Sequence, residues 1–522
     1  MPNHVARHLT TVTAAVVLVL VAVGLNRLAD TIPDPDVFYH IRHAWLYRTR
    51  GLTLTEFPWV QCSVIRLCAA DLWYGFHLLL LPFTFGGDLL RGVEIGSIVW
   101  TASALLLVYA ALRRMAMRWA LGWTFLFAFI AADITHRLTM LRPQPISLGL
   151  DLLLVALLTA PPAQRGRALP MAFLLGVAQT FVHYALFWVP VLIFLTVSLA
   201  QLATRSRIAL GRGLALIVGL GAGMLLRPNP LGALQLLDIQ LFRWLLEKQS
   251  QPLMMAKEAM PLVWSKFIDQ YLPVSLLVIL AVPWFLLGSG RATEPAVRRQ
   301  RVIGWTALAL AMLFLALSFK VALRSTDFYV AFATLFVASA VTGATRPLGY
   351  IRRVSVSFAA AAILTWAALN NVYRYHMFVR NAYQPLAEQE VAQWLERNTP
   401  AGAIVFHVEW DKFAPLFFWN QHDRYINGMD PIFEYAYDAK LYWKHHHLLL
   451  DHVAVEADRA VLYLAADAPP EDVYQVMSAD FKAAAIVVDP QVTPHLLESL
   501  RADHRFKEAF QGAHEMVFEV PR

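Results

Sequence analysis

The chain has 522 residues, of which 58% are hydrophobic and 16% are charged, and its formal net charge at pH 7 is +7. A composition this apolar excludes a soluble globular protein and is typical of a polytopic membrane protein. The positive charge does not require a nucleic-acid partner, because the basic residues gather between apolar runs, as they do in membrane proteins. The sequence contains no Walker loop, no GxGxxG motif and no CxxC array.

Apolar runs of roughly 16 to 22 residues, each long enough to cross about 30 Å of hydrocarbon, predict about eleven transmembrane helices. No small-residue cleavage site follows the first run, so we interpret it as an uncleaved span and not as a signal peptide. The runs lie at 11–29, 90–112, 119–133, 145–160, 169–184, 186–203, 213–226, 272–288, 302–319, 328–345 and 354–372.

Basic clusters occupy alternate loops between these runs, and the positive-inside rule then places the N-terminus in the cytoplasm. The same orientation places the first loop, residues 31–89, and everything after residue 372 on the outer side. We therefore expect a polytopic membrane protein with a transmembrane domain over 1–372 and an extracytoplasmic domain over 373–522. The clusters are Arg113, Arg114 and Arg118; Arg165 and Arg167; Arg205, Arg207 and Arg212; Arg291, Arg298, Arg299 and Arg301; and Arg346, Arg352 and Arg353.

The first outer loop opens with TIPDPDVFYHIRHAWLYRTRG, residues 31–51. Asp34 is a candidate helix N-cap and Pro35 suits a first helical position, so a helix is predicted from there to about Arg50. Its apolar stripe and polar face predict a helix on the membrane surface, with carboxylate and imidazole groups turned toward water or a cavity. The simpler alternative is that Asp34 only caps the helix and that the histidines are solvated. The polar face would carry Asp36, His40, His43 and Tyr47.

The rest of this loop contains a second predicted surface helix, near 71–85, which ends at a pair of glycines. The only two cysteines of the chain, Cys62 and Cys68, precede it. On the outer side they would be able to form a disulfide, and two free thiols are the equal alternative.

The tail after residue 372 is less apolar and is long enough for an independent domain. Helical patterns alternate there with short runs of β-forming residues, which predicts a small α/β domain. The helical patterns cover 386–398, 471–480 and 494–502, and the β-type runs are AIVFHV (403–408), AVLYLA (460–465), AAIVVD (484–489) and MVFEV (516–520).

Charged groups at membrane depth are costly, at about 2.5–3.5 kcal/mol each on insertion scales, and so are candidates for function. On the outer side Arg142, Arg227 and Arg324 run against the positive-inside bias. An anionic ligand at the outer membrane surface would explain them, since the guanidinium fork fits a phosphate group. Snorkelling or internal pairing is the alternative, for example Arg324 with Asp327 or Arg142 with Asp151.

Acidic residues supply the complementary half of this candidate site. Asp34, Asp36 and Asp133 lie at the predicted outer boundary, where carboxylate oxygens would hold a hard divalent cation such as Mg²⁺ or Mn²⁺. Asp36 and Asp133 are the metal-ligand candidates, and His40 nearby is counted with the groups that would contact a phosphate. In the other interpretation, Asp34 or Asp36 acts as a general base toward an acceptor hydroxyl.

One segment of the tail combines aromatic and acidic residues, at 407–433. Trp410 and Asp411 follow a predicted strand, and an aromatic run comes directly after them. Stacking on an aromatic ring together with hydrogen bonding to an acid suits sugar or peptide recognition. A buried corner between strand and turn is the alternative.

The predicted chain runs from one span through an acidic motif on a surface helix and a second surface helix to a core of many spans and an outer α/β domain. This order of segments resembles the GT-C glycosyltransferase superfamily, which includes oligosaccharyltransferase catalytic subunits, protein O-mannosyltransferases and lipid A aminoarabinose transferases. IPDPDVFYHIRHAWLYRTRG is similar to the acidic first-loop motif of these enzymes, and DLWYGFHLLLLPFTFGGDLLRG to their second surface helix. Asp133 stands where oligosaccharyltransferases carry a second acidic motif, and VEWDKF loosely resembles their acceptor motif at Trp410 and Asp411. The second motif is a single acid here, and only one tryptophan precedes Asp411.

The resemblance implies an inverting, membrane-bound transferase that moves a sugar from a polyprenyl-phosphate or polyprenyl-diphosphate donor to a protein, lipid or glycan acceptor at the outer face. It implies catalytic roles for Asp34 and Asp36, contact of Arg142, Arg227, Arg324 and His40 with the donor phosphate, and a divalent cation as the one expected cofactor. A flippase or export component for lipid-linked glycans is an alternative without catalysis, and a polymerase or ligase of surface polysaccharide is a third.

Overall fold

The computed structural model describes residues 2–28, 30–161, 165–250, 253–287, 294–345, 350–386, 388–452 and 472–521. Most of these residues are helical, and the strands among them form one small sheet. The chain forms two compact units. Unit 1 comprises Met1–Pro33, Arg91–Leu226 and Lys257–Ala382, and unit 2 comprises Asp34–Leu90, Arg227–Ala256 and Tyr383–Arg522.

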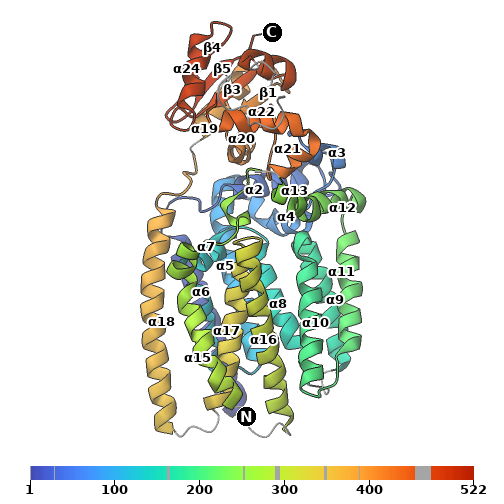
Figure 1. Cartoon of the computed structure of the whole chain (residues 1–522), viewed down its shortest axis with the longest axis vertical. Coiled ribbons are helices and arrows are strands. Elements are labelled where there is room, and N and C mark those ends of the chain that lie inside the picture. Colours follow the sequence, from blue (N-terminus) through green and yellow to red (C-terminus); the bar gives the residue numbers. More distant parts are fainter. Residues whose placement is uncertain are drawn as a thin grey trace. The chain divides into compact units, whose positions relative to one another are not determined.

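Unit 1 is built from long apolar helices that run roughly alongside one another (Figure 1). Two short 3₁₀ turns, at Tyr184–Leu186 and Lys257–Ala259, lie between these helices. A π turn at Phe267–Tyr271 follows the short α14 (Trp264–Lys266). The helices are α1 (Pro2–Asn26), α5 (Leu89–Arg114), α6 (Ala120–Phe129), α7 (Ala132–Thr139), α8 (Gln144–Leu158), α9 (Arg165–Val182), α10 (Trp188–Ala203), α11 (Leu210–Leu225), α15 (Leu272–Leu287), α16 (Pro295–Lys320), α17 (Ser325–Thr345) and α18 (Tyr350–Val379).

Among the described residues, six helical segments are long and apolar enough to cross a membrane, or up to eight if each of two bent pairs is one span. The bent pairs are α7 with α8, at 106°, and α11 with the helices that begin at Pro230, at 105°. A multi-pass membrane protein is therefore confirmed. The count of eleven spans stays a prediction, and the span expected at 354–372 lies in α18, where the side chains of 350–361, 363 and 364 are outside the described residues.

Close backbone contact holds α9 against α11. A side chain at Gly219 would place its Cβ 2.1 Å from the carbonyl oxygen of Phe173, and one at Gly223 would lie 2.5 Å from that of Val177. Small residues four apart allow two helix backbones to approach closely. The resulting van der Waals packing stabilises the helix pair in lipid, where the hydrophobic effect does not drive helices together. The Gly219 and Gly223 pair in the sequence thus selects the helix packing.

Unit 2 contains short helices from three separate stretches of the chain. From the first outer loop come α2 (Asp36–Arg50), α3 (Val64–Cys68), α4 (Tyr74–Leu80) and a 3₁₀ turn (Leu81–Thr84). The middle stretch forms α12 (Pro230–Asp238), a π turn (Ile239–Arg243) and α13 (Trp244–Ser250). The tail adds α19 (Gln389–Asn398), a 3₁₀ turn (Trp410–Lys412), α20 (Phe413–Trp419), α21 (Ile432–Tyr437), α22 (Ala439–Leu449), α23 (Val473–Gln475), a π turn (Val476–Asp480) and α24 (Pro494–Ala502).

The described strands of the tail form a mixed sheet in the order β2-β1-β3-β5-β4. The parallel strands are β1 (Ile404–His407), β2 (Arg424–Tyr425) and β3 (Ala485–Val488), and the antiparallel ones are β4 (Lys507–Gln511) and β5 (Met516–Glu519). The β-type runs predicted at 403–408, 484–489 and 516–520 and the helix at 494–502 match this sheet and α24. The run at 460–465 lies outside the described residues.

A segment of the first outer loop lies along the edge of this sheet. The backbone N–H of Tyr425 donates to the carbonyl of Trp59 at 2.7 Å, and that of Gln61 donates back to Tyr425 at 2.8 Å. Cys62 joins the apolar core under the sheet. The first loop and the tail therefore share one compact unit, whereas the sequence predicted a boundary at residue 372; a separate domain over 373–522 stays a prediction.

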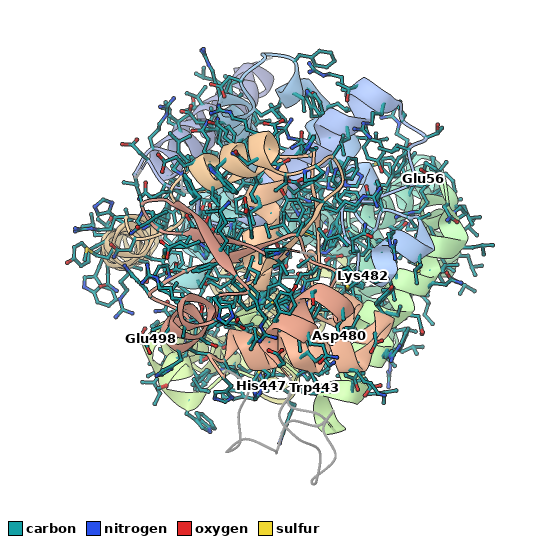
Figure 2. The ribbon with its side chains drawn as sticks, turned by 90° about the horizontal axis from the view of Figure 1, so that it is seen from above. Glu56, Trp443, His447, Asp480, Lys482 and Glu498 are labelled. Carbon is teal, nitrogen blue, oxygen red and sulfur yellow. The ribbon has the colours of Figure 1, made fainter. Side chains whose placement is uncertain are left out.

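Helix α22 packs against the sheet: Leu448 belongs to its apolar core, and the ring of His445 lies 5.4 Å from that of Phe406 in β1. Trp443 and His447 lie close together on α22, one turn apart (Figure 2), and Lys444 on the same helix pairs with Asp480 at 2.6 Å. These contacts fix α22 onto the end of the Val476–Asp480 turn.

Candidate functional site

The acidic motif of the first outer loop begins α2, as the sequence predicts. The helix starts at Asp36 and ends at Arg50, with Pro35 already in helical conformation. Oδ1 of Asp34 accepts the backbone N–H of Asp36 at 3.4 Å, which is the contact expected of a capping residue. The Asp34 side chain is buried and Asp36 is half-buried. Catalysis by either acid stays a prediction.

The polar face of α2 is not turned toward water. His40, His43 and Tyr47 are at most 4% exposed. They contact α4 and the residues before it because His77 and Asp71 lie opposite them and provide hydrogen bonds. Of the two orientations predicted for this row, the one toward water is therefore wrong, as is the alternative of solvated histidines, and the one toward a cavity stays a prediction. A face with polar residues at helical spacing is buried here against a second polar surface.

Asp71 is the centre of this buried network. One carboxylate oxygen accepts from Tyr47 Oη at 2.9 Å and lies 2.6 Å from His77 Nδ1, and the other accepts the backbone N–H of Trp73 at 2.8 Å. The second nitrogen of His77 lies 2.8 Å from His40 Nδ1. We call Asp71, His77 and His43 together the His–Asp cluster.

Electrostatics favour an ionised Asp71 beside a neutral His43. Burial opposes ionisation of Asp71, yet its neighbours His77 and His43 bring the pKa of that carboxyl well below its usual value. Burial lowers the pKa of His43 to about 3, so this imidazole is neutral at physiological pH. A neutral imidazole beside a carboxylate is the protonation state in which both groups bind metal ions.

Unit 1 contains a second cluster, made of three arginines around one glutamate. Arg137 pairs with Glu258 at 2.5 Å and with Asp327 at 3.1 Å. Arg142 pairs with the other oxygen of Glu258 at 3.0 Å, and Arg324 also contacts that oxygen. We call Arg137, Arg142, Arg324 and Glu258 the arginine cluster; the sequence predicted two of its members, Arg142 and Arg324, as phosphate ligands.

The internal pairs that the sequence offered are replaced by others. Arg142 and Arg324 share Glu258, and the partner of Asp327 is Arg137. Burial opposes ionisation of Glu258, but Arg137, Arg324 and Arg142 hold its pKa well below the usual range. Sequence reasoning missed Glu258 because it lies in a connection with no motif, 116 residues from Arg142 along the chain.

The remaining predicted ligands have different surroundings. Arg227 belongs to unit 2, where its guanidinium donates to the carbonyl oxygens of Asp71 and Leu72 at 3.1 and 3.4 Å. His40 also belongs to unit 2 and contacts His77. The structure therefore groups Arg142 with Arg324 and attaches Arg227 to the segment that carries the His–Asp cluster. Contact of Arg227 and His40 with a phosphate stays a prediction.

Asp133, the second metal-ligand candidate, is engaged inside unit 1. Its carboxylate lies 2.8 Å from Lys266 Nζ and accepts from Tyr271 Oη at 2.8 Å. Within the described part of the chain, one group of three or more His, Cys, Asp or Glu side chains is close enough to share a metal ion, and it is the His–Asp cluster. It contains neither Asp36 nor Asp133, so a cation held by those two acids stays a prediction.

The predicted acceptor residues lie in the 3₁₀ turn between β1 and α20. Trp410 and Asp411 are half-buried. Next to them Lys412 pairs with Glu388 at 2.9 Å and with Glu515 at 3.1 Å, and burial raises the pKa of Glu409 to about 7. Acceptor binding by Trp410 and Asp411 stays a prediction.

The two cysteines are free thiols in the structure, Cys62 buried and Cys68 half-buried. Burial raises the pKa of the Cys62 thiol to about 12, so it is protonated and unreactive. The open choice left by the sequence is thereby decided for free thiols.

No protein-family model matches the chain, and no curated protein matches it. Solved structures do match. The apo oligosaccharyltransferase of Archaeoglobus fulgidus is similar with a TM-score of 0.55 and 11% identity, over 92% of this chain and 70% of that one. The apo form of ArnT from Cupriavidus metallidurans gives a TM-score of 0.54 and 13% identity, over 99% of this chain and 98% of that one.

ArnT from the same organism bound to undecaprenyl phosphate matches as well, with a TM-score of 0.52 and 12% identity over 98% of each chain. Oligosaccharyltransferases and aminoarabinose transferases are two of the groups that the sequence resembled. At these identities the likeness shows the fold alone, which this chain shares with an oligosaccharyltransferase and with ArnT.

Proposed function

We propose that this protein is a glycosyltransferase of the inner membrane that moves a sugar from a polyprenyl-linked donor to an acceptor at the outer face. The single observation that carries the proposal is the arginine cluster, a concentration of cationic groups on α7 and on the connections α7–α8 and α16–α17 of a multi-pass protein with the fold of these transferases. A lipid-linked donor presents the matching group, a phosphate or diphosphate on an apolar chain.

The geometry of the arginine cluster supports a phosphate site. Three guanidinium groups face the carboxylates of Glu258 and Asp327, so positive charge is in excess. The side chains of Arg142 and Arg324 are 20% and 41% exposed, so a ligand has access to them, whereas Arg137 is 10% exposed and holds the cluster together. Guanidinium groups bind phosphate through paired hydrogen bonds, each worth about 1.5–3 kcal/mol when charged.

We also propose a catalytic role for the acids of α2. Asp34 or Asp36 would accept the proton of the acceptor hydroxyl as that oxygen attacks the anomeric carbon, and the lipid phosphate would leave with the electrons of the glycosidic bond. In the alternative role one of these acids binds a divalent cation that neutralises the leaving phosphate. Trp410 and Asp411 would contact the acceptor.

Native mass spectrometry of the purified protein with undecaprenyl phosphate, undecaprenyl diphosphate and their glycosylated forms tests the donor site. We expect binding by the wild type and at least tenfold weaker binding by Arg142→Ala and Arg324→Ala. Arg374→Ala is the matched control, because Arg374 is an arginine of unit 1 paired with Asp269 outside the arginine cluster. Equal binding by all four proteins would refute the assignment.

Transfer activity distinguishes the proposed enzyme from a flippase. A donor with a labelled sugar, incubated with the protein and an extract of candidate acceptors, should yield a labelled acceptor and free polyprenyl phosphate. Movement of intact donor across sealed vesicles, with no labelled acceptor, would contradict the proposal and favour transport.

A further inference from the structure

We propose that the His–Asp cluster is a metal site that binds one divalent transition-metal ion of the zinc type, through His43 Nε2, Asp71 Oδ2 and His77 Nδ1. The three ligand atoms lie within 4.8 Å of one another. Two imidazole nitrogens and one carboxylate oxygen are a ligand set that zinc accepts, unlike the all-oxygen sets of Mg²⁺ and Ca²⁺. The inference does not depend on the proposed function.

The distances need one small movement. Two ligands of a tetrahedral zinc ion, each about 2.1 Å from the metal, lie about 3.4 Å apart. Asp71 Oδ2 is 2.6 Å from His77 Nδ1 and 3.9 Å from His43 Nε2. A shift of the carboxylate away from His77 and toward His43 brings both distances closer to that value. The ion would take the place of the proton that His77 Nδ1 shares with Asp71, and His77 would bind it as the neutral tautomer protonated on Nε2, the nitrogen that faces His40 Nδ1.

Each ligand already has a partner on its other polar atom. His43 Nδ1 lies 3.0 Å from Tyr39 Oη, and His77 Nε2 lies 2.8 Å from His40 Nδ1. The second oxygen of Asp71 accepts a backbone N–H at 2.8 Å. Metal-binding histidines nearly always use their second nitrogen in this way, because the hydrogen bond fixes the tautomer and the ring orientation. The surroundings are therefore built for ligands that point inward.

The site is buried and joins two segments of the chain, so we assign the ion a structural role. The side chains of His43, Asp71 and His77 are 5%, 5% and 0% exposed. The ion would join α2 to α4 and so fix the helix whose first turn carries Asp34 and Asp36. A buried metal would do this more strongly than one neutral hydrogen bond, which contributes about 1 kcal/mol.

Elemental analysis of the protein purified in detergent without chelator and without a polyhistidine tag tests the site. We expect about one zinc per chain, loss of the metal in His43→Ala and His77→Ala, and full retention in His495→Ala, which changes an exposed histidine of α24. His40→Gln keeps all three ligands and should weaken zinc binding about 10- to 100-fold in competition with a chelator.

A second measurement covers the case in which the alanine variants do not fold. Wild-type protein stripped by dialysis against chelator should melt at a lower temperature than before and should recover when Zn²⁺ is returned, while Co²⁺ should give the visible bands of a tetrahedral site. Wild type that holds no metal, takes up none and melts at the same temperature with chelator would overturn the proposal. Full metal retention in both His43→Ala and His77→Ala would overturn it as well.

Discussion

Replacing Glu258 with glutamine should destabilise the protein and at the same time strengthen its binding of lipid phosphate. Glu258 is the common partner of Arg137, Arg142 and Arg324. The amide keeps the shape of the side chain but removes its negative charge. The three guanidinium groups then repel one another with only Asp327 left to balance them.

The expected loss of stability and gain in lipid affinity follow from the burial of Glu258 and from its three arginine partners. Breaking a fully buried ion pair by removing one partner costs about 3–5 kcal/mol. The Glu258 side chain is 15% exposed and glutamine still accepts one hydrogen bond, so we expect a loss of about 1–3 kcal/mol, or several degrees in Tm. A phosphate in the arginine cluster no longer competes with a carboxylate, and a gain of about 1.4 kcal/mol corresponds to a tenfold lower Kd.

Differential scanning fluorimetry gives the change in Tm, and titration of undecaprenyl phosphate followed by native mass spectrometry gives the Kd. Asp269→Asn is the control, because Asp269 is an exposed acid of unit 1 paired with Arg374. The double variant Glu258→Gln with Arg324→Ala should lose the gain in affinity. A Glu258→Gln protein with unchanged Tm and weaker lipid binding would refute the reasoning.

Three further outcomes are expected. Asp34→Asn and Asp36→Asn combined should abolish transfer of labelled sugar while the protein still inserts and purifies as a monodisperse particle; full activity would exclude both acids as catalytic residues. Burial raises the pKa of Glu409 to about 7, so the wild type loses stability as the pH rises from about 4.5, where the unfolded chain deprotonates, to about 7, where the folded protein does. Glu409→Gln has no such loss and should raise Tm at pH 8 but leave it unchanged at pH 4.5. An equal change in Tm at both pH values would contradict the raised pKa. Lys266→Met removes the ion-pair partner of Asp133 and leaves its hydrogen bond to Tyr271, and should lower the free energy of unfolding by about 1 kcal/mol, because the Lys266 side chain is 36% exposed. The fall in Tm measures this loss, and Asp133→Asn added to Lys266→Met should restore part of it.

The sequence by itself determined the local elements and the class of protein. The Asp34-Pro35-Asp36 motif begins a helix that ends at Arg50 because proline and a capping acid favour helix entry whatever surrounds them. Apolar runs define α5, α16 and α17 because only a hydrophobic segment of that length suits a bilayer. The β-branched runs at 404–407, 485–488 and 516–519 form strands for equally local reasons.

Only the tertiary structure decided which of these groups meet. Glu258 reaches Arg142 and Arg324 across 116 and 66 residues of chain, and the pairing depends on desolvation, which no spacing rule encodes. Likewise, the period of α2 places His40 and His43 on one face, but whether that face meets water or His77 depends on how α4 folds back onto it. Local sequence therefore identified candidate residues of the site, and long-range packing determined which of them are in contact.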